Sequence, residues 1–105
     1  MTKQIREPLT EMEIALVDKF EHIVKEEIDK IDPIGLLKLG APPNEYAAEI
    51  RGITLRIRQT SSWLWLSEIM YIVFSYNFDM EDAGPQTKYM EAAKRISDKI
   101  YGDRK

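Results

Sequence analysis

The chain's single histidine is the first residue to consider for chemistry. If the segment around it is helical, His22, Glu26 and Asp29 share one face at i, i+4 and i+7, which makes them a feasible set of metal ligands. That face points away from the apolar residues, into solvent, and offers no further side chains to orient the ligands. We therefore predict a solvated helix face here, with no metal and no cofactor.

Glu27 has a more unusual position, because its spacing places it inside the apolar stripe of the same helix. A buried carboxylate is destabilising unless it is paired. One interpretation is an acid with a shifted pKa in a functional pocket. We favour a structural ion pair with Arg51, Arg56 or Arg58, or a solvated position at the end of the stripe.

Enzyme chemistry has little support in the sequence. The chain has no cysteine, which excludes thiol nucleophiles and zinc–thiolate sites. It also lacks a glycine-rich phosphate loop, a zinc-binding helix motif and a nucleophile combined with a histidine. We predict that the protein is not an enzyme.

The charge balance argues against nucleic acid as a partner. Arg51, Arg56 and Arg58 precede Trp63 and Trp65, a combination that would suit stacking on a single strand. The formal net charge is −3 and the pI is about 5.2, however, so no basic field surrounds the molecule. We predict no nucleic-acid partner.

The length of 105 residues indicates a single domain over 1–105, with an N-terminal arm at 1–8 and a loose C-terminal end at 103–105. The N-terminus lacks the apolar run of a signal peptide. The most apolar segment, 63–74, is interrupted by Ser67 and Glu68 and is shorter than the ~20 residues of a membrane span. We expect a cytoplasmic protein without membrane contact.

The first helix is predicted from about Thr10 to Lys30. Thr10 and Glu13 form a capping box, in which each side chain binds a backbone N–H at the helix start. Apolar residues then recur every three or four positions, which is typical of a helix with one buried face. The members of this stripe are Leu16, Val17, Phe20, Ile23, Val24, Ile28 and Ile31.

A corner of the chain is predicted next. Proline disfavours helix at the residue before it, so the first helix should end at Asp32, and a short helix over 33–39 should begin with Asp32 as its N-cap. Gly40 is a natural left-handed stop. We interpret this segment as a structural corner rather than a binding loop. Its residues are Asp32, Pro33, Gly35, Gly40, Pro42, Pro43 and Tyr46.

The pattern from about Asn44 onwards is ambiguous. Tyr46, Ile50, Ile53 and Ile57 have helical spacing, whereas 53–58 alternates between apolar and polar residues as a strand would. We favour a helix, because no second strand is available as a partner and an isolated hairpin is marginal.

The next predicted helix, about Ser62 to Phe78, is apolar on nearly every side. Trp63 and Trp65 point about 160° apart at helical spacing, so one packed face cannot bury both. Either neighbouring helices surround this helix, or part of it is an exposed patch that would serve as an interface. The candidate interaction surface consists of Leu64, Trp65, Tyr71, Ile72 and Tyr76.

An acidic loop at 79–85 is expected before a last helix that runs from Pro85 or Gln86 to Tyr101. The short connections favour antiparallel neighbours. The predicted fold is therefore all-α, a small antiparallel bundle of four main helices with a short extra helix at about 33–39. The apolar stripe of the last helix is Tyr89, Ala92, Ala93, Ile96 and Ile100.

The predicted corner resembles a known group of proteins. The runs Asp32-Pro33-Ile34-Gly35-Leu36-Leu37 and Gly40-Ala41-Pro42-Pro43-Asn44-Glu45-Tyr46 are similar to the D-P-I-G-L-L and G-A-P-x-x-E-Y segments of small YugE-like bacterial proteins of unknown function. The resemblance implies an all-helical fold and a bacterial source, and it brings no established activity. Members often have Asp-Pro after the Glu-Tyr pair, where this chain has Ala47 and Ala48, so the start of the third helix stays open.

These observations favour a non-catalytic protein-interaction or regulatory module, either immunity- or adaptor-like or a homodimer. Its partner would be another protein or a second copy of the chain. The alternative is a small-ligand binder or an enzyme accessory subunit, with a pocket between helices lined by tryptophan and tyrosine side chains.

Overall fold

Helices make up the regular structure of residues 11–57 and 62–101, which are the residues that the computed structural model describes. Two short elements, α4 (Met80–Ala83) and the 3-10 helix η1 (Gln86–Tyr89), lie between α3 and α5. No strand occurs within these ranges, so the predicted all-α fold is confirmed. The main helices are α1 (Glu11–Ile31), α2 (Ala47–Ile57), α3 (Trp63–Asn77) and α5 (Met90–Tyr101).

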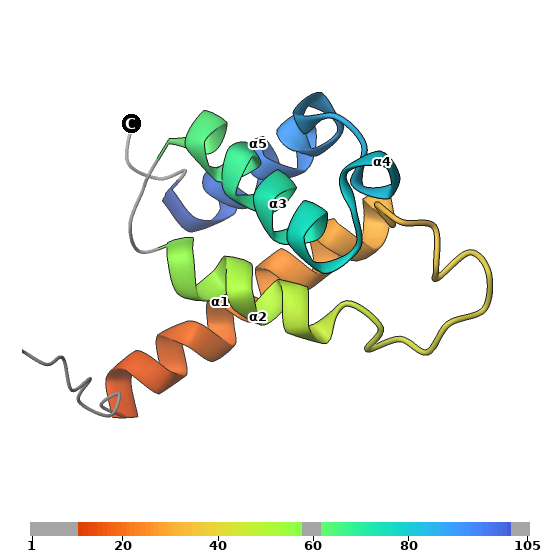
Figure 1. Ribbon diagram of the computed structural model, residues 1–105. Helices are drawn as coiled ribbons and strands as arrows, with labels where there is room; N and C mark the ends of the chain where they lie inside the picture. Colours follow the sequence, from red (N-terminus) through yellow and green to blue (C-terminus); the bar gives the residue numbers. More distant parts are fainter. Residues whose placement is uncertain (1–10, 58–61, 102–105) are drawn as a thin grey trace, which may run out of the picture.

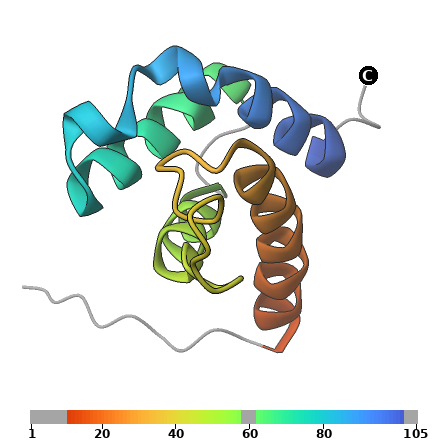
Figure 2. The same ribbon diagram turned by 90° about the vertical axis from the view of Figure 1, so that its right-hand side faces the viewer.

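The chain reverses its direction from each main helix to the next (Figure 1). α1 packs against α2, and α3 packs against α5, which gives two layers. Contacts of α1 with α5 and of α2 with α3 join the layers. Figure 2 shows that the layer of α3 and α5 lies across α1 rather than alongside it.

The helical interpretation of the segment after Asn44 is confirmed. Ile50, Ile53 and Ile57 are all buried on one face of α2, as a helix requires, and Tyr46, the residue before it, is buried as well. The alternative of a strand at 53–58 is therefore wrong for the described part, 53–57. The helix begins at Ala47, after a turn in which the backbone N–H of Ala47 binds the carbonyl oxygen of Asn44 at 3.0 Å.

Aromatic rings fill the centre of the core. Phe74 of α3 packs edge-on against Tyr46, with ring centroids 5.5 Å apart, and stacks on Tyr89 at 5.7 Å. The Tyr89 hydroxyl donates to the carbonyl oxygen of Ala83 at 2.7 Å, so the polar end of this buried ring is satisfied. These contacts tie α3 to the residue preceding α2 and to η1.

The stripe predicted for the first helix is buried in part. Val17, Val24 and Ile28 are buried, whereas Leu16 is 45% exposed and was wrongly assigned to the core. The physical reason is that the N-terminal turns of α1 extend beyond the other helices (Figure 1), so no other described helix covers them there. The capping box, the N-terminal arm and the C-terminal end lie outside the part of the chain that is described.

The short extra helix predicted at 33–39 is wrong, because this segment is a series of turns. Asp32 has a left-handed backbone with φ of 46°, and Gly35 follows with φ of 83°. Both values break a right-handed helix before it can propagate. The backbone instead closes local hydrogen bonds, such as the N–H of Gly35 to the carbonyl of Asp32 at 2.9 Å.

The region between α3 and α5 also differs from the prediction. The expected acidic loop contains α4, whose N-cap Asp79 accepts from the backbone N–H of Asp82 at 2.8 Å. Gly84, with φ of 78°, ends that turn. The last helix then begins as η1 and becomes α-helical only at Met90, with Tyr89, Ala92, Ala93 and Ile96 buried as expected.

Candidate functional site

The start of α3 follows from its sequence. The hydroxyl of Ser62, where the helix was predicted to begin, accepts from the backbone N–H of Trp65 at 3.3 Å and so acts as the N-cap. The inner face of the helix then packs into the core through Leu66, Met70 and Phe74. At the end of the helix, the side-chain amide of Asn77 donates to Glu49 of α2 at 2.8 Å.

The opposite face of α3 stays exposed and apolar. Leu64 is 48% exposed, Trp65 53%, Ile72 54% and Tyr76 88%. We call these four residues the α3 surface. Their positions in the helical repeat point them away from the side of α3 that carries the buried residues, so they face solvent. Of the two alternatives for this helix, the exposed patch is therefore the one found, and the neighbouring helices cover only its inner side.

Tyr71 does not join its predicted companions. It is half-buried and packs towards the core, with its ring centroid 6.5 Å from that of Tyr89. Trp63, at the start of the helix, is 36% exposed and lies beneath the ammonium of Lys94, 5.2 Å from the ring centroid. This cation–π contact attaches α5 to Trp63 and leaves Trp65 as the outward-facing tryptophan.

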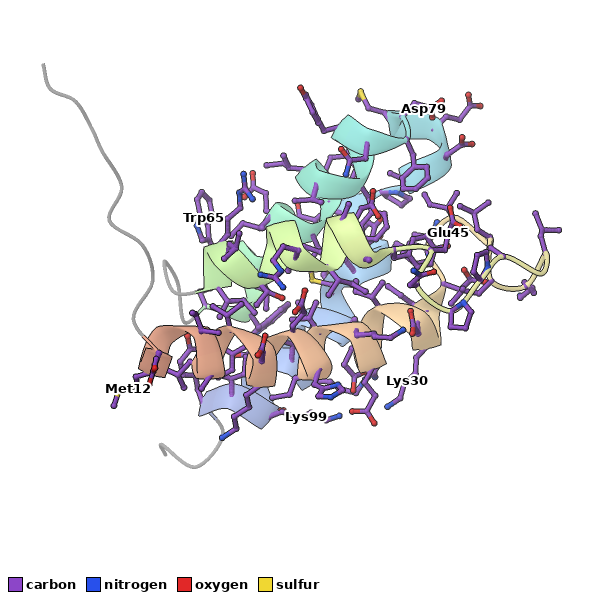
Figure 3. All side chains as sticks on the ribbon, turned by 90° about the horizontal axis from the view of Figure 1, so that it is seen from below. Met12, Lys30, Glu45, Trp65, Asp79 and Lys99 are labelled. Atoms are coloured by element: carbon purple, nitrogen blue, oxygen red, sulfur yellow. The ribbon has the colours of Figure 1, made fainter. Side chains whose placement is uncertain are left out.

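Acidic side chains accompany the α3 surface, although the sequence pattern did not link Glu68 or the acidic loop at 79–85 to it. Glu68 lies on α3 itself, and Asp79, Glu81 and Asp82 follow at its C-terminal end, all three of them exposed. The sequence contains no lysine or arginine from 59 to 87. The labelled side chains in Figure 3 place Trp65 near one end of α3 and Asp79 beyond the other, so the apolar stripe has an acidic end.

The predicted structural corner is held by one carboxylate. Asp32 Oδ1 accepts from the Tyr46 hydroxyl at 2.6 Å and from the backbone N–H of Leu37 at 3.1 Å, while Oδ2 accepts from that of Lys38 at 2.9 Å. Tyr46 is 1% exposed, and burial together with its bond to Asp32 raises its pKa to about 12. Burial opposes ionisation of Asp32, but the hydrogen bonds from Tyr46, Leu37 and Lys38 prevail and lower its pKa. The carboxylate therefore has its acceptor sites occupied by the fold.

Glu27 is fully buried and paired, although not with the predicted arginines. It accepts hydrogen bonds from Arg95 at 2.7 Å, Lys99 at 2.8 Å and Lys30 at 3.2 Å. Arg51 pairs instead with Glu21 across α1 and α2. Arg56 donates to the carbonyl oxygen of Gly52, and Arg58 lies outside the described residues. An acid with three cationic partners stays ionised, so this cluster is structural.

The helix face of His22, Glu26 and Asp29, the one set of ligand-type residues that the sequence offered, lies on the outside of α1. No group of three or more histidine, aspartate or glutamate side chains in residues 11–57 and 62–101 is arranged to hold a metal ion. Asp29 accepts from the ammonium of Lys25 at 2.6 Å and Glu26 from that of Lys99 at 3.0 Å, while His22 lies exposed on the helix surface.

A hollow of about 430 Å³ lies between α1 and α2. Two of its charged residues are engaged by the fold, since Glu21 binds Arg51 and Lys25 binds Asp29. The alternative of a pocket lined by tryptophan and tyrosine does not describe this hollow. Its lining residues are Asp18, Glu21, His22, Lys25, Asn44, Ala47 and Ile50.

Comparison with protein-family models, curated proteins and solved structures gives no match to this chain. The resemblance to the YugE-like group therefore stays a prediction. Among the described helices, none combines the length and the apolar character needed to cross a bilayer.

Proposed function

We propose that this protein is a non-catalytic protein-interaction module and that the α3 surface is its docking site. The observation that carries the proposal is a helix whose inner face is already packed and whose outer face still presents Leu64, Trp65, Ile72 and Tyr76. Tryptophan and tyrosine are favoured anchors at protein interfaces. A contiguous exposed apolar patch on a small protein is typical of an interaction site.

An adaptor-like or immunity-like protein of the bacterial cytoplasm is the concrete form of this proposal. The polar groups of the other clusters support a non-catalytic function, because they already serve the fold. Asp32 holds the corner, and Glu27 joins α1 to α5. The alternative within the same class is a homodimer formed through the α3 surface.

Affinity capture from a bacterial lysate tests the proposal. The tagged protein would be compared with Trp65→Ser, and with Leu55→Ser as a matched control, because Leu55 is an apolar residue of α2 that is 43% exposed. We expect one stoichiometric partner that is retained by the wild type and by Leu55→Ser and lost in Trp65→Ser. Circular dichroism would establish first that both variants are folded.

Sedimentation of the purified protein over a range of concentrations separates the two forms of the proposal. A dimer that dissociates on Trp65→Ser substitution identifies the partner as a second copy. A monomer at all concentrations, together with no captured protein that depends on Trp65, would rule out the α3 surface as a docking site.

A further inference from the structure

All the charged side chains that α3 and α4 themselves carry are acidic, while Lys94 of α5 reaches Trp63 and Lys88 of η1 lies beside Gly84. Glu68 lies within the helix, and Asp79, Glu81 and Asp82 stand at its C-terminal end, where α4 packs against α3. No basic residue occurs from 59 to 87, although the whole chain has 15 lysines and arginines. The outer face of α3 and the adjoining α4 therefore present four carboxylates and no basic side chain of their own.

The geometry favours a helix as the occupant. The exposed residues run from Leu64 to Tyr76, which corresponds to about 18 Å along the helix axis at 1.5 Å per residue. A convex apolar stripe of this length matches the apolar side of a second helix, whose side chains pack between those of the first. The described residues contain no strand, so they offer no sheet edge for an extended peptide.

The carboxylates beside the α3 surface distinguish between three possible occupants, which are a second copy of the chain, a lipid bilayer and a basic partner protein. A second copy of the chain would present the same acidic stretch, and its nearby cations are already engaged, since Lys94 lies over Trp63 and Lys88 donates to the carbonyl oxygen of Pro33. The surface of an anionic bilayer would repel the same carboxylates. A partner with basic residues next to its apolar ones can cover the apolar stripe and also pair with the carboxylates beside it.

Resting on the interaction function proposed above, we propose that the α3 surface binds a cationic amphipathic helix of a partner protein. The apolar side of that helix covers Trp65, Ile72 and Tyr76. Its lysine or arginine side chains lie near Glu68 and towards Glu81 and Asp82, so the acidic end of the stripe sets the direction in which the helix binds.

The probe is a tryptophan-free synthetic helix with leucine on one side and lysine on the other, titrated against the full chain while tryptophan fluorescence is recorded. Two comparison peptides separate charge from shape. One has glutamate in place of lysine, and the other has the same composition in a scrambled order without an apolar side. We expect saturable one-to-one binding of the lysine helix, and affinities roughly tenfold or more weaker for both comparison peptides.

Matched charge variants locate the binding site. Glu68→Gln/Glu81→Gln/Asp82→Asn should weaken binding several-fold and flatten its dependence on salt. The control Glu11→Gln/Asp18→Asn/Asp98→Asn removes the same number of carboxylates from exposed positions elsewhere and should leave both quantities near their wild-type values. Ile72→Ser, which keeps both tryptophans as reporters, should abolish the fluorescence change.

Equal effects of the two triple variants would overturn the proposal, because binding would then follow net charge alone. Equal affinities for the lysine and glutamate peptides, or no binding of either, would overturn it as well. If a Trp65-dependent partner were nevertheless captured, the interaction function would stand and only the basic helical occupant would fall. If no such partner were captured either, both proposals would fail.

Discussion

The Nε atom of Arg95 lies 2.7 Å from Oε1 of Glu27, so a charged hydrogen bond joins α5 to the C-terminal part of α1. Lys99, one helical turn further along α5, binds the other carboxylate oxygen at 2.8 Å. The carboxylate is fully buried, while its cations reach it from partly exposed positions. This arrangement lets the charged heads stay hydrated and keeps the acid satisfied at the interface between the two layers.

Glu27→Gln is expected to lower the free energy of unfolding by about 2–4 kcal/mol, since the neutral amide loses the charge-assisted hydrogen bonds from Arg95 and Lys99. Urea denaturation at neutral pH measures this change. The matched control is Glu26→Gln, because Glu26 is 61% exposed and binds only Lys99 of this group. Its effect should stay within about 0.5 kcal/mol, as for other surface pairs.

The contribution of Glu27 should also depend on pH. Burial by itself would raise its pKa, but hydrogen bonds from Lys99, Arg95 and Lys30 outweigh burial and lower the pKa from 4.5 to about 2. A group whose pKa is lower in the folded state stabilises the fold above its unfolded pKa and loses that effect as the pH falls towards its folded pKa. The difference in stability between wild type and Glu27→Gln should therefore shrink from pH 4.5 to about 2. A difference that stays constant over this window would contradict the assignment.

Tyr46→Phe tests the corner. The substitution keeps the buried ring but removes the donor to Asp32 and the acceptor of the backbone N–H of Leu36 at 3.2 Å. We expect a loss of about 1–3 kcal/mol, because Leu36 and Asp32 each lose a partner. Tyr76→Phe, at a position that is 88% exposed, should have no measurable effect in the same thermal and urea denaturation experiments.

The same tyrosine predicts sensitivity to alkali. Burial and the bond to Asp32 raise the pKa of Tyr46 from 10.0 to about 12. The unfolded chain therefore loses this proton first, and stability should fall as the pH rises from 10.0 towards 12. Tyr46→Phe should show a smaller fall across that window than the wild type. An identical slope in both proteins would mean that Tyr46 does not control it.

Replacement of Gly52 and of Gly35 by alanine should change the stability of the protein in opposite directions. Gly52 lies inside α2, where a new Cβ would meet Val73 at 4.0 Å and Arg56 at 3.5 Å, both ordinary contacts. Gly52→Ala should therefore stabilise the protein by about 0.5–1 kcal/mol. Gly35→Ala should destabilise it by about 1 kcal/mol, because φ is +83° at that turn. Melting temperatures of the two variants, measured in one buffer, give the comparison.

The two faces of α3 can be distinguished by truncation. Met70→Ala should lower the free energy of unfolding by about 2–5 kcal/mol, because a fully buried side chain would leave a cavity. Ile72→Ser, two residues away and 54% exposed, should change it by less than about 0.5 kcal/mol. Similar losses in both variants would show that the outer face is covered in the isolated protein.

Local patterns were sufficient to predict most of the helices. The spacing of Ile50, Ile53 and Ile57 placed one face of α2 in the core, and Ser62 marked the start of α3. These signals are short-range, because helical periodicity and capping depend on neighbours within a few residues. The prediction of a short helix at 33–39 was wrong because it considered only such neighbours. The backbone of Asp32 is left-handed, and its carboxylate accepts a hydrogen bond from Tyr46, fourteen positions along the chain.

The sequence by itself therefore determined the fold class, the buried sides of α2 and α5 and the surplus of apolar residues on α3. Only the tertiary structure decided that Glu27 pairs with Arg95 and Lys99, 68 and 72 positions away, and that Trp65 faces solvent while Lys94 covers Trp63. The physical reason is that the periodicity of one helix gives its apolar sides but not the neighbour that covers each of them. That choice depends on how the two layers cross, which no local pattern encodes.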